Sequence, residues 1–251
     1  MICTALVFFM TPGLAFFYGG LVRRKNVCNT MMACVAIMGL SVLLWTMFGY
    51  SLSFGGNHAG IIGDFRWAFL NDVGWEAGPY ADTIPHLVFA ALYNNAAFQM
   101  MFAMITPALI TGAVVGRMRF KALFAFIALW SFLVYYPMAH MVWGEGGFLA
   151  AIGSVDFAGG NVVHISSGVS ALVLATYLGR RKGYEKTSYR IHNIPFVVLG
   201  ASLLWFGWFG FNAGSALAAD GLAAHAFMTS AIASASAMLI WMLIDYLKSK
   251  K

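Results

Sequence analysis

The chain is dominated by seven long apolar runs, separated by short gaps that hold nearly all of its charge. Of its 251 residues, 61% are hydrophobic and only 10% are charged. Water-soluble domains do not have this composition, and an apolar run of about 20 residues is long enough to cross a bilayer as a helix. The sequence therefore predicts an all-α, polytopic transmembrane helix bundle of about seven spans. The expected spans are 2–22, 31–54, 86–116, 122–143, 157–179, 194–216 and 222–247.

The basic residues predict an orientation for these spans. All of the 15 lysines and arginines except Arg66 follow the first, third, fifth or seventh run. Because cytoplasmic loops carry an excess of lysine and arginine, we expect the N-terminus outside and the C-terminus in the cytoplasm. The same bias explains the net charge of +6, so that charge gives no reason to expect a nucleic-acid partner.

One long polar segment, from Gly55 to Pro85, lies on the side opposite the basic gaps. It has no hydrophobic periodicity, which favours a structured external loop over an eighth span. The cysteines at Cys3, Cys28 and Cys34 have no metal-binding spacing, and their odd number gives no disulfide framework. We expect them to be buried apolar side chains.

His164 is the most informative polar residue, because it lies within the apolar run from Gly159 to Leu178. An ionisable side chain is costly at membrane depth, so such a residue is a functional-site hypothesis by default. Gly168, Ala171 and Ala175 follow on the same face, and small residues at this spacing predict that the face packs on protein or borders a narrow path. The alternative is a core histidine whose hydrogen bonds are satisfied within the bundle.

Asp156 precedes the same run at its outer end. A carboxylate there can cap the free amides of the helix and suits the positive end of the helix dipole. The alternative is a direct ligand role.

Aromatic residues gather near the outer ends of three runs. Phe98 and Phe102 are four residues apart, as are Phe211 and Ser215, and Trp143 closes the fourth run. Residues four apart share one helix face. Such rings often form only an interfacial belt. If they converge instead, aromatic faces and one hydroxyl could hold a small cation that has lost its water.

The remaining histidines are weaker candidates, and ordinary polar duties suffice for most of them. His140 is ambiguous, because it lies one turn before the tryptophan that closes the fourth run. No two histidines have the spacing of a metal pair, and the chain has no phosphate-binding glycine loop and no nucleophile with a base. We therefore expect no enzyme, no metal and no cofactor. The weaker candidates are His58, His86, His192 and His225.

Four segments are distinctive together: Pro12–Gly20 (PGLAFFYGG), Ala139–Trp143 (AHMVW), Asp156–His164 (DFAGGNVVH) and Trp208–Ser215 (WFGFNAGS). In sequence and order they resemble the Amt/Mep/Rh family of ammonium transporters, of the bacterial Amt type, and the resemblance runs along the whole chain.

The resemblance implies homotrimers of eleven-helix protomers, each with its own narrow pore for ammonium and methylammonium. It also implies a PII-type regulator on the cytoplasmic face. The implied site residues are Phe98, Trp143 and Ser215 for ammonium binding, Phe102 and Phe211 for a stacked gate, His164 for the pore and Asp156 as the supporting acid.

The chain departs from this pattern in three ways. Asn161 stands where threonine is expected, and the segment from Gly144 to Val155 carries one apparent extra residue. More importantly, the family fold pairs two inverted five-helix repeats, and its second pore histidine comes from the tenth helix. We expect residues 1–251 to be a partial transmembrane domain, the first repeat plus two helices of the second, and therefore an incomplete protomer.

The leading functional hypothesis is thus transport of ammonium through a narrow apolar pore. One alternative is an ammonium sensor of the same fold that binds without conducting. Another is a haem- or quinone-binding membrane subunit that uses His140 and His164.

Overall fold

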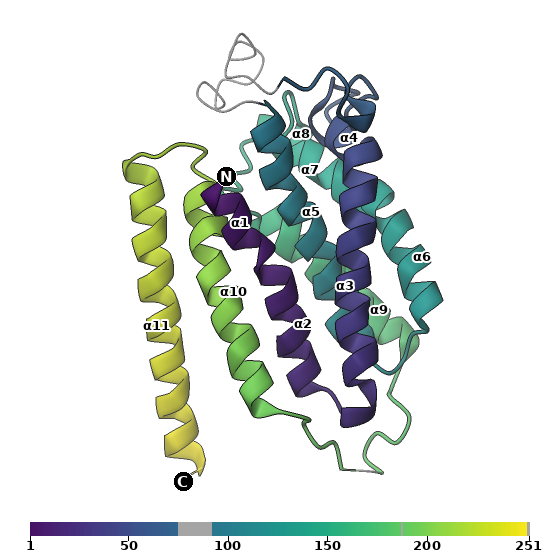
Figure 1. Ribbon diagram of the computed structural model, residues 1–251, viewed down its shortest axis with the longest axis vertical. Helices are drawn as coiled ribbons and strands as arrows, with labels where there is room; N and C mark the ends of the chain where they lie inside the picture. Colours follow the sequence, from purple (N-terminus) through teal and green to yellow (C-terminus); the bar gives the residue numbers. More distant parts are fainter. Residues whose placement is uncertain (75–91, 187, 250–251) are drawn as a thin grey trace.

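The computed structural model describes residues 1–74, 92–186 and 188–249, and the elements in these ranges are helices that run roughly along one axis (Figure 1). Short 3-10 turns (η1, η3) and π-helical turns (η2, η6, η7) lie between or within them. The elements are α1 (Ile2–Phe8), α2 (Met10–Leu21), η1 (Arg24–Asn26), α3 (Val27–Leu44), η2 (Trp45–Gly49), α4 (Tyr50–Phe54), η3 (Ala68–Leu70), α5 (Leu92–Val114), α6 (Phe120–Trp130), η6 (Ser131–Tyr135), α7 (Tyr136–Trp143), α8 (Phe148–Ala151), η7 (Gly160–Ile165), α9 (Ser166–Leu178), α10 (Ile194–Gly214) and α11 (Gly221–Ser249).

Seven helical stretches of the described residues are long and apolar enough to cross a membrane, so the predicted all-α bundle of about seven spans is confirmed. The second and fourth are longer than expected, because the second also includes η1 and the start of α3, and the fourth also includes α8. The start of the expected run 86–116, the later part of the external loop and His86 lie outside the described residues. The seven stretches are Ile2–Leu21, Arg24–Phe54, Asn94–Val114, Phe120–Ala151, Gly160–Leu178, Ile194–Gly214 and Gly221–Ser249.

The first span and α10 pack along a seam of glycines, and Figure 1 shows them side by side. A Cβ atom on Gly200 would clash with the backbone nitrogen of Phe17, and one on Gly20 would lie 2.7 Å from the carbonyl oxygen of Asn193. Gly207 approaches Leu6 equally closely from the next turns of α10. Helix association in a membrane depends on such close backbone contact, because lipid tails are as apolar as leucine.

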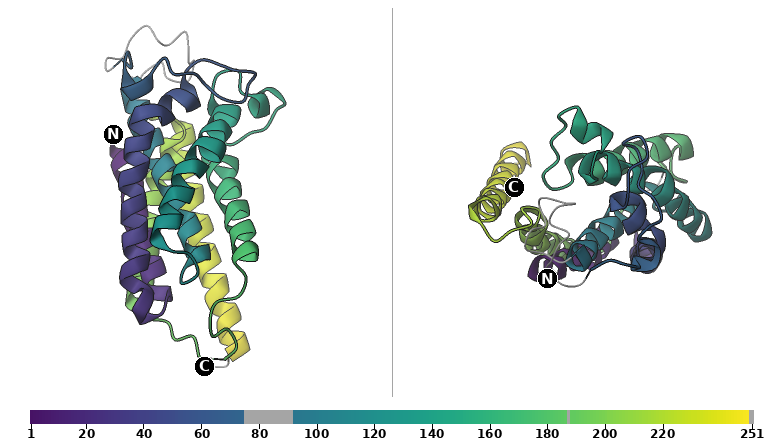
Figure 2. Two further views of the ribbon diagram at one scale, coloured as in Figure 1. Left: turned by 90° about the vertical axis from the view of Figure 1, so that its right-hand side faces the viewer. Right: turned by 90° about the horizontal axis from the view of Figure 1, so that it is seen from above.

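The helices differ widely in how much of their surface the rest of the chain covers. In the span of α5, 72% of residues are buried, whereas in α11 only 6% are. Figures 1 and 2 show α11 at the edge of the bundle, beside α10. It contacts α10 through the stacked rings of Phe209 and Phe227, 4.2 Å apart, and through a 2.7 Å hydrogen bond from the Asn212 side chain to Ser230.

The small-residue face of α9 is expected to pack on protein or to border a narrow path, and the described residues cover it unevenly: Ala171 is half-buried. Gly168 is exposed, and no described atom lies within 4 Å of its Cβ position. The face of α9 that does pack carries hydroxyls instead. Ser166 and Ser167 are buried, and Ser170 accepts a 2.8 Å hydrogen bond from the indole of Trp130. Each serine also donates to a carbonyl one turn back, which satisfies its hydroxyl inside the bundle.

Polar contacts at the end of the bundle opposite the basic loops hold the described part of the external segment. His140 is fully buried, with Nδ1 3.1 Å from the carbonyl oxygen of Ser53 and Nε2 3.4 Å from the side-chain oxygen of Asn57. Burial acts to raise the pKa of Asp64, but hydrogen bonds from Arg66 and its positive charge outweigh that effect and hold the pKa below its usual value. Ordinary loop contacts therefore occupy this histidine and this acid.

The cysteine expectation is only partly correct. Cys34 is buried, Cys3 is half-buried and Cys28 is exposed. Cys28 lies at the start of α3, where the bundle leaves that face uncovered.

Candidate functional site

Three phenyl rings meet between α5 and α10. Phe98 and Phe102 occupy successive turns of α5, and their ring centroids are 4.9 Å apart. Phe211 of α10 faces Phe102 with a centroid distance of 4.3 Å and an interplanar angle of 34°. Phe102 and Phe211 are each only 1% exposed. The two form a closely packed pair that blocks the space between the helices.

Trp143 lies on one side of this pair. Its ring centroid is 6.0 Å from that of Phe102, with the planes nearly perpendicular at 88°. Its indole nitrogen donates a 2.8 Å hydrogen bond to the backbone carbonyl of Asp156, which fixes the orientation of the half-buried ring. The tryptophan ends α7 because Gly144 leaves helical geometry immediately afterwards.

His164 contacts the second ring of the pair, that of Phe211. Its ring is 6.1 Å from that of Phe211 and is nearly parallel to Trp208, at 5.9 Å and 16°. The side chain is exposed and its ring makes no hydrogen bond to any described residue. Trp143, Phe102, Phe211 and His164 thus form a continuous series of ring contacts.

Asp156 holds the turn that carries His164. Its carboxylate accepts hydrogen bonds from the backbone amides of Gly159, Gly160, Asn161 and Val162, at 2.6 to 3.0 Å. These amides lie at the start of η7, where they would otherwise have no partner in an apolar bundle. Gly159, with a φ of 115°, permits the turn that brings them together.

Ser215 lies at the end of α10, beside the outer phenyl ring. A Cβ atom on the neighbouring Gly214 would lie 2.9 Å from the Phe98 ring. The Ser215 hydroxyl donates a 2.7 Å hydrogen bond to the carbonyl oxygen of Phe211. Because its hydrogen is used in this way, the oxygen is left as an acceptor. An acceptor is what a protonated amine requires.

Beyond the phenyl pair a cavity of about 210 Å³ extends along α2, α5 and α10. His164 is the one ionisable imidazole among its lining residues, and the rest of the lining is almost wholly apolar. Sequence reasoning did not identify Trp208, although it lies one turn from Phe211 on the same helix face. The lining consists of Met10, Leu14, Phe17, Tyr18, Ile105, Leu109, Val163, His164, Leu204, Trp208 and Phe211.

The described residues do not bring His140 into this site, since its ring nitrogens face the carbonyl oxygen of Ser53 and the side-chain oxygen of Asn57 at the outer end of the bundle. No group of three or more His, Cys, Asp or Glu side chains in the described ranges could hold a metal ion. The arrangement of His140 therefore gives no support to a haem- or quinone-binding subunit.

The fold and site define a class: a multi-pass helical membrane protein with an aromatic constriction leading into a narrow apolar cavity. The model of the Ammonium Transporter Family matches residues 1–251. An ammonium transporter of Bacillus subtilis is 49% identical over 249 residues, which is 99% of this chain and 59% of that protein. The chain therefore belongs to the ammonium transporter family.

Solved structures agree with this assignment. The crystal structure of Candida albicans Mep2 has a TM-score of 0.89 and 31% identity, covering 100% of this chain and 54% of that one. A sensor Amt protein has a TM-score of 0.88 and 30% identity, covering 100% of this chain and 62% of that one. The chain thus spans somewhat more than half the length of the relatives it matches.

Proposed function

We propose that this chain forms the ammonium-recognising part of an ammonium transporter. Phe98, Trp143 and Ser215 would hold the ion, with Phe102 and Phe211 as the gate beneath it. The observation that carries the proposal is the series of ring contacts from Trp143 to His164, which leads from a half-buried tryptophan into the apolar cavity.

The cavity lining favours passage of a species close to neutral ammonia. A charge at mid-membrane costs roughly 2.5 kcal/mol or more, and the lining of the cavity offers no carboxylate to offset that cost. Ammonium can give up a proton at the aromatic site or at the gate, whereas K⁺ has no proton to give up. The same lining would therefore select against K⁺.

His164 would border the path beneath the gate. A neutral imidazole can donate and accept one hydrogen bond each, which suits ammonia. Its exposed ring and the uncovered Gly168 beside it indicate that a further protein wall faces this side in the working transporter. On this ground we propose that residues 1–251 are a partial transmembrane domain and that its pore is completed by protein outside it.

The basic loops give the proposed orientation. Arg23, Arg117 and Arg180 gather at one end of the bundle, the end opposite the external segment, and we assign that end to the cytoplasm. The N-terminus then lies outside and the C-terminus in the cytoplasm of a plasma-membrane protein. Family membership also supports a homotrimer and a PII-type regulator at the cytoplasmic face.

An ammonium sensor of the same fold is the weaker candidate. The fold does not distinguish the two, because a sensor Amt protein and Mep2 have nearly equal TM-scores to this chain. The names of the curated relatives favour transport, since the relatives of Bacillus subtilis and Archaeoglobus fulgidus, 49% and 45% identical, are named ammonium transporters.

The proposal is tested by uptake of labelled methylammonium in cells that lack their own ammonium transporters. The chain is joined to those segments of the Bacillus subtilis relative that it does not match. Saturable uptake that ammonium competes for is the expected result. If the fusion reaches the membrane, binds ammonium and yet moves no methylammonium, the sensor reading replaces the transporter reading.

A further inference from the structure

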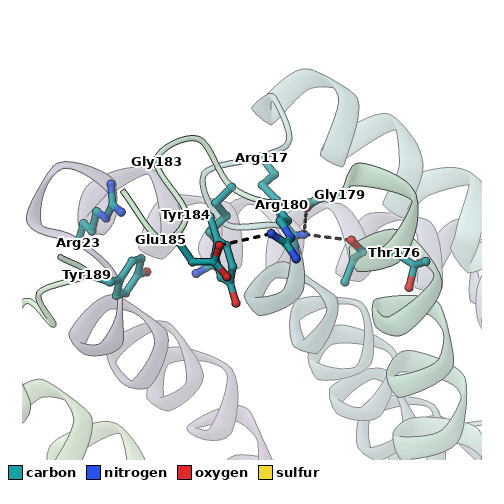
Figure 3. A pocket seen from close by; sticks show the side chains of 11 residues that line it. Arg23, Arg117, Thr176, Gly179, Arg180, Gly183, Tyr184, Glu185 and Tyr189 are labelled. Carbon is teal, nitrogen blue, oxygen red and sulfur yellow. Dashed lines mark hydrogen bonds and ion pairs between the residues drawn. The ribbon is translucent and has the colours of Figure 1, made fainter. Parts of the chain in front are cut away.

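A second cavity, of about 620 Å³, lies at the basic end of the bundle, far along the helices from the phenyl pair (Figure 3). It is formed where α5 and α9 end, against the loop that leads from α9 to α10. Its volume is in the range of pockets that take small organic molecules. The lining consists of Arg23, Arg117, Ala175, Thr176, Gly179, Arg180, Arg181, Gly183, Tyr184, Glu185 and Tyr189.

The charge of this pocket is strongly unbalanced. Among the described residues its lining holds four arginines against one carboxylate, that of Glu185. Its ion pair between Arg180 and Glu185 is 3.5 Å long, and the two side chains are 76% and 69% exposed. An exposed pair of that length is weak and is screened by salt. Gathering like charges costs free energy unless an anion offsets them.

The pocket holds its arginines in defined positions. The guanidinium groups of Arg23 and Arg181 lie 4.9 and 5.5 Å from the ring centre of Tyr189, and that of Arg180 lies 5.2 Å from the ring centre of Tyr184. These rings restrict guanidinium groups that would otherwise move freely. Figure 3 shows Arg23 and Tyr189 together on one side of the pocket and Arg180 beside Glu185 in its middle.

Arg117 removes a feature that would otherwise repel an anion. The C-terminal end of α9 points its free carbonyls toward the pocket, and such an end carries partial negative charge. Arg117 donates to the carbonyl oxygens of Ala175 and Gly179, at 3.0 and 2.6 Å, and also to that of Ala113. The helix end is therefore neutralised, and Arg180 and Arg181 remain to face a ligand.

From this geometry we infer a binding site for a phosphate ester. The guanidinium group of arginine binds phosphate oxygens in pairs and is more weakly hydrated than the ammonium group of lysine. A cluster of arginines therefore favours a phosphate group as its ligand over a single carboxylate. The pocket is much larger than a phosphate ion, which favours a phosphate carried on a small organic group. Because the pocket lies where the spans end, the ester can be a lipid headgroup or a soluble metabolite of the same chemistry.

The site is tested on the whole chain with four variants. Arg180→Gln and Arg181→Gln should each weaken binding about tenfold or more, since each removes a charge-assisted hydrogen bond. Glu185→Gln should strengthen binding, because it releases Arg180 from its competing carboxylate. Lys182→Gln is the matched control: it removes one positive charge from the same loop, but Lys182 does not line the pocket.

Two measurements distinguish the sources of the ligand. The first is a calorimetric titration with glycerol 3-phosphate in phosphatidylcholine nanodiscs, and the second is retention of phosphatidic acid, against phosphatidylcholine, in native mass spectrometry. The site is supported if either measurement shows weaker binding in the two arginine variants, tighter binding in Glu185→Gln and no change in Lys182→Gln. The pattern in the calorimetric titration identifies a soluble ester as the ligand, and the pattern in mass spectrometry identifies a lipid headgroup. Misfolding cannot produce the tighter binding of Glu185→Gln. Binding in neither measurement, or an equal loss in Lys182→Gln and Arg180→Gln, overturns the proposal.

Discussion

Asp156 connects both sides of the phenyl pair. Its carboxylate holds four amides of the turn that carries His164, while its backbone carbonyl accepts the indole hydrogen of Trp143. One residue therefore positions the proposed ion site and the cavity histidine together. Sequence reasoning expected Asp156 to cap the helix, and the cap is present. The bond to Trp143 involves the backbone, so no side-chain pattern could have predicted it.

Asp156→Asn should destabilise the protein by about 1.5–3 kcal/mol, because an amide has one acceptor oxygen and no charge where the carboxylate holds four donors. The midpoint temperature of thermal unfolding in detergent should fall by several degrees. Asp220→Asn is the control, since Asp220 accepts from one amide, that of Ala223, at the exposed start of α11. Equal effects of the two substitutions would contradict the assigned role.

Other residues of the site were predictable to different degrees. Phe98 and Phe102 are four residues apart, as are Phe211 and Ser215, and this spacing indicated that each pair shares one helix face. Convergence of two helices is a property of tertiary packing, so the 4.3 Å contact between Phe102 and Phe211 could not be derived from spacing. Trp208 was missed for the same reason, because its role depends on the position of His164 on another helix.

Among the elements, α10 has the most demanding packing. Its glycines contact backbone atoms of the first span, so a methyl group on Gly200 would clash with the backbone of α2. Apolar periodicity predicted that α10 spans the membrane but could not predict its partner. A line of glycines in an apolar helix signals a close neighbour without identifying it.

Gly200→Ala should separate α10 from α2 and cost about 1–3 kcal/mol or more, as overpacking does. Gly168→Ala is the matched control, because it adds the same methyl group to a helix face with no described atom within 4 Å. The stability of both variants is measured by thermal unfolding and by protease resistance in detergent. A Gly200→Ala protein as stable as the Gly168→Ala protein would show that the seam is not tightly packed.

On the scale of the whole molecule, the spans and their number were predictable because each depends only on local composition. The exposure of α9 and α11 was not, since it depends on which surfaces other helices cover. The uncovered His164 face is the clearest case. The small residues predicted that this face packs on protein or borders a narrow path, and no described atom lies within 4 Å of the Cβ position of Gly168.

Cysteines introduced at Arg24, Lys121 and Lys182 should react with an impermeant thiol reagent only from the cytoplasmic side. The reason is the basic bias of these loops. Labelling in intact cells and in inverted vesicles, on a background without native cysteines, gives the answer. Labelling of any one of these positions in intact cells would contradict the proposed topology.

Residues 1–251 expressed alone should not support selective ammonium uptake. His164 is exposed among the described residues, and we propose that protein outside the chain covers it, because a polar ring without a partner at that depth is costly. Growth at low ammonium and methylammonium uptake, measured beside a full-length relative, test this expectation. Uptake near the full-length rate would mean that the chain forms a sufficient pore.

The most direct test of the account is ion selectivity at the aromatic site in the fusion described above. Trp143→Leu should weaken ammonium and methylammonium competition about 30-fold, because a desolvated cation over an indole is worth about 2 kcal/mol. Ser215→Ala should weaken it about tenfold through loss of one acceptor to a charged donor. Trp241→Leu, on the exposed face of α11 where the ring is 70% exposed, should change nothing. Unchanged selectivity among ammonium, methylammonium and K⁺ in both site variants, with normal amounts in the membrane, would contradict the account.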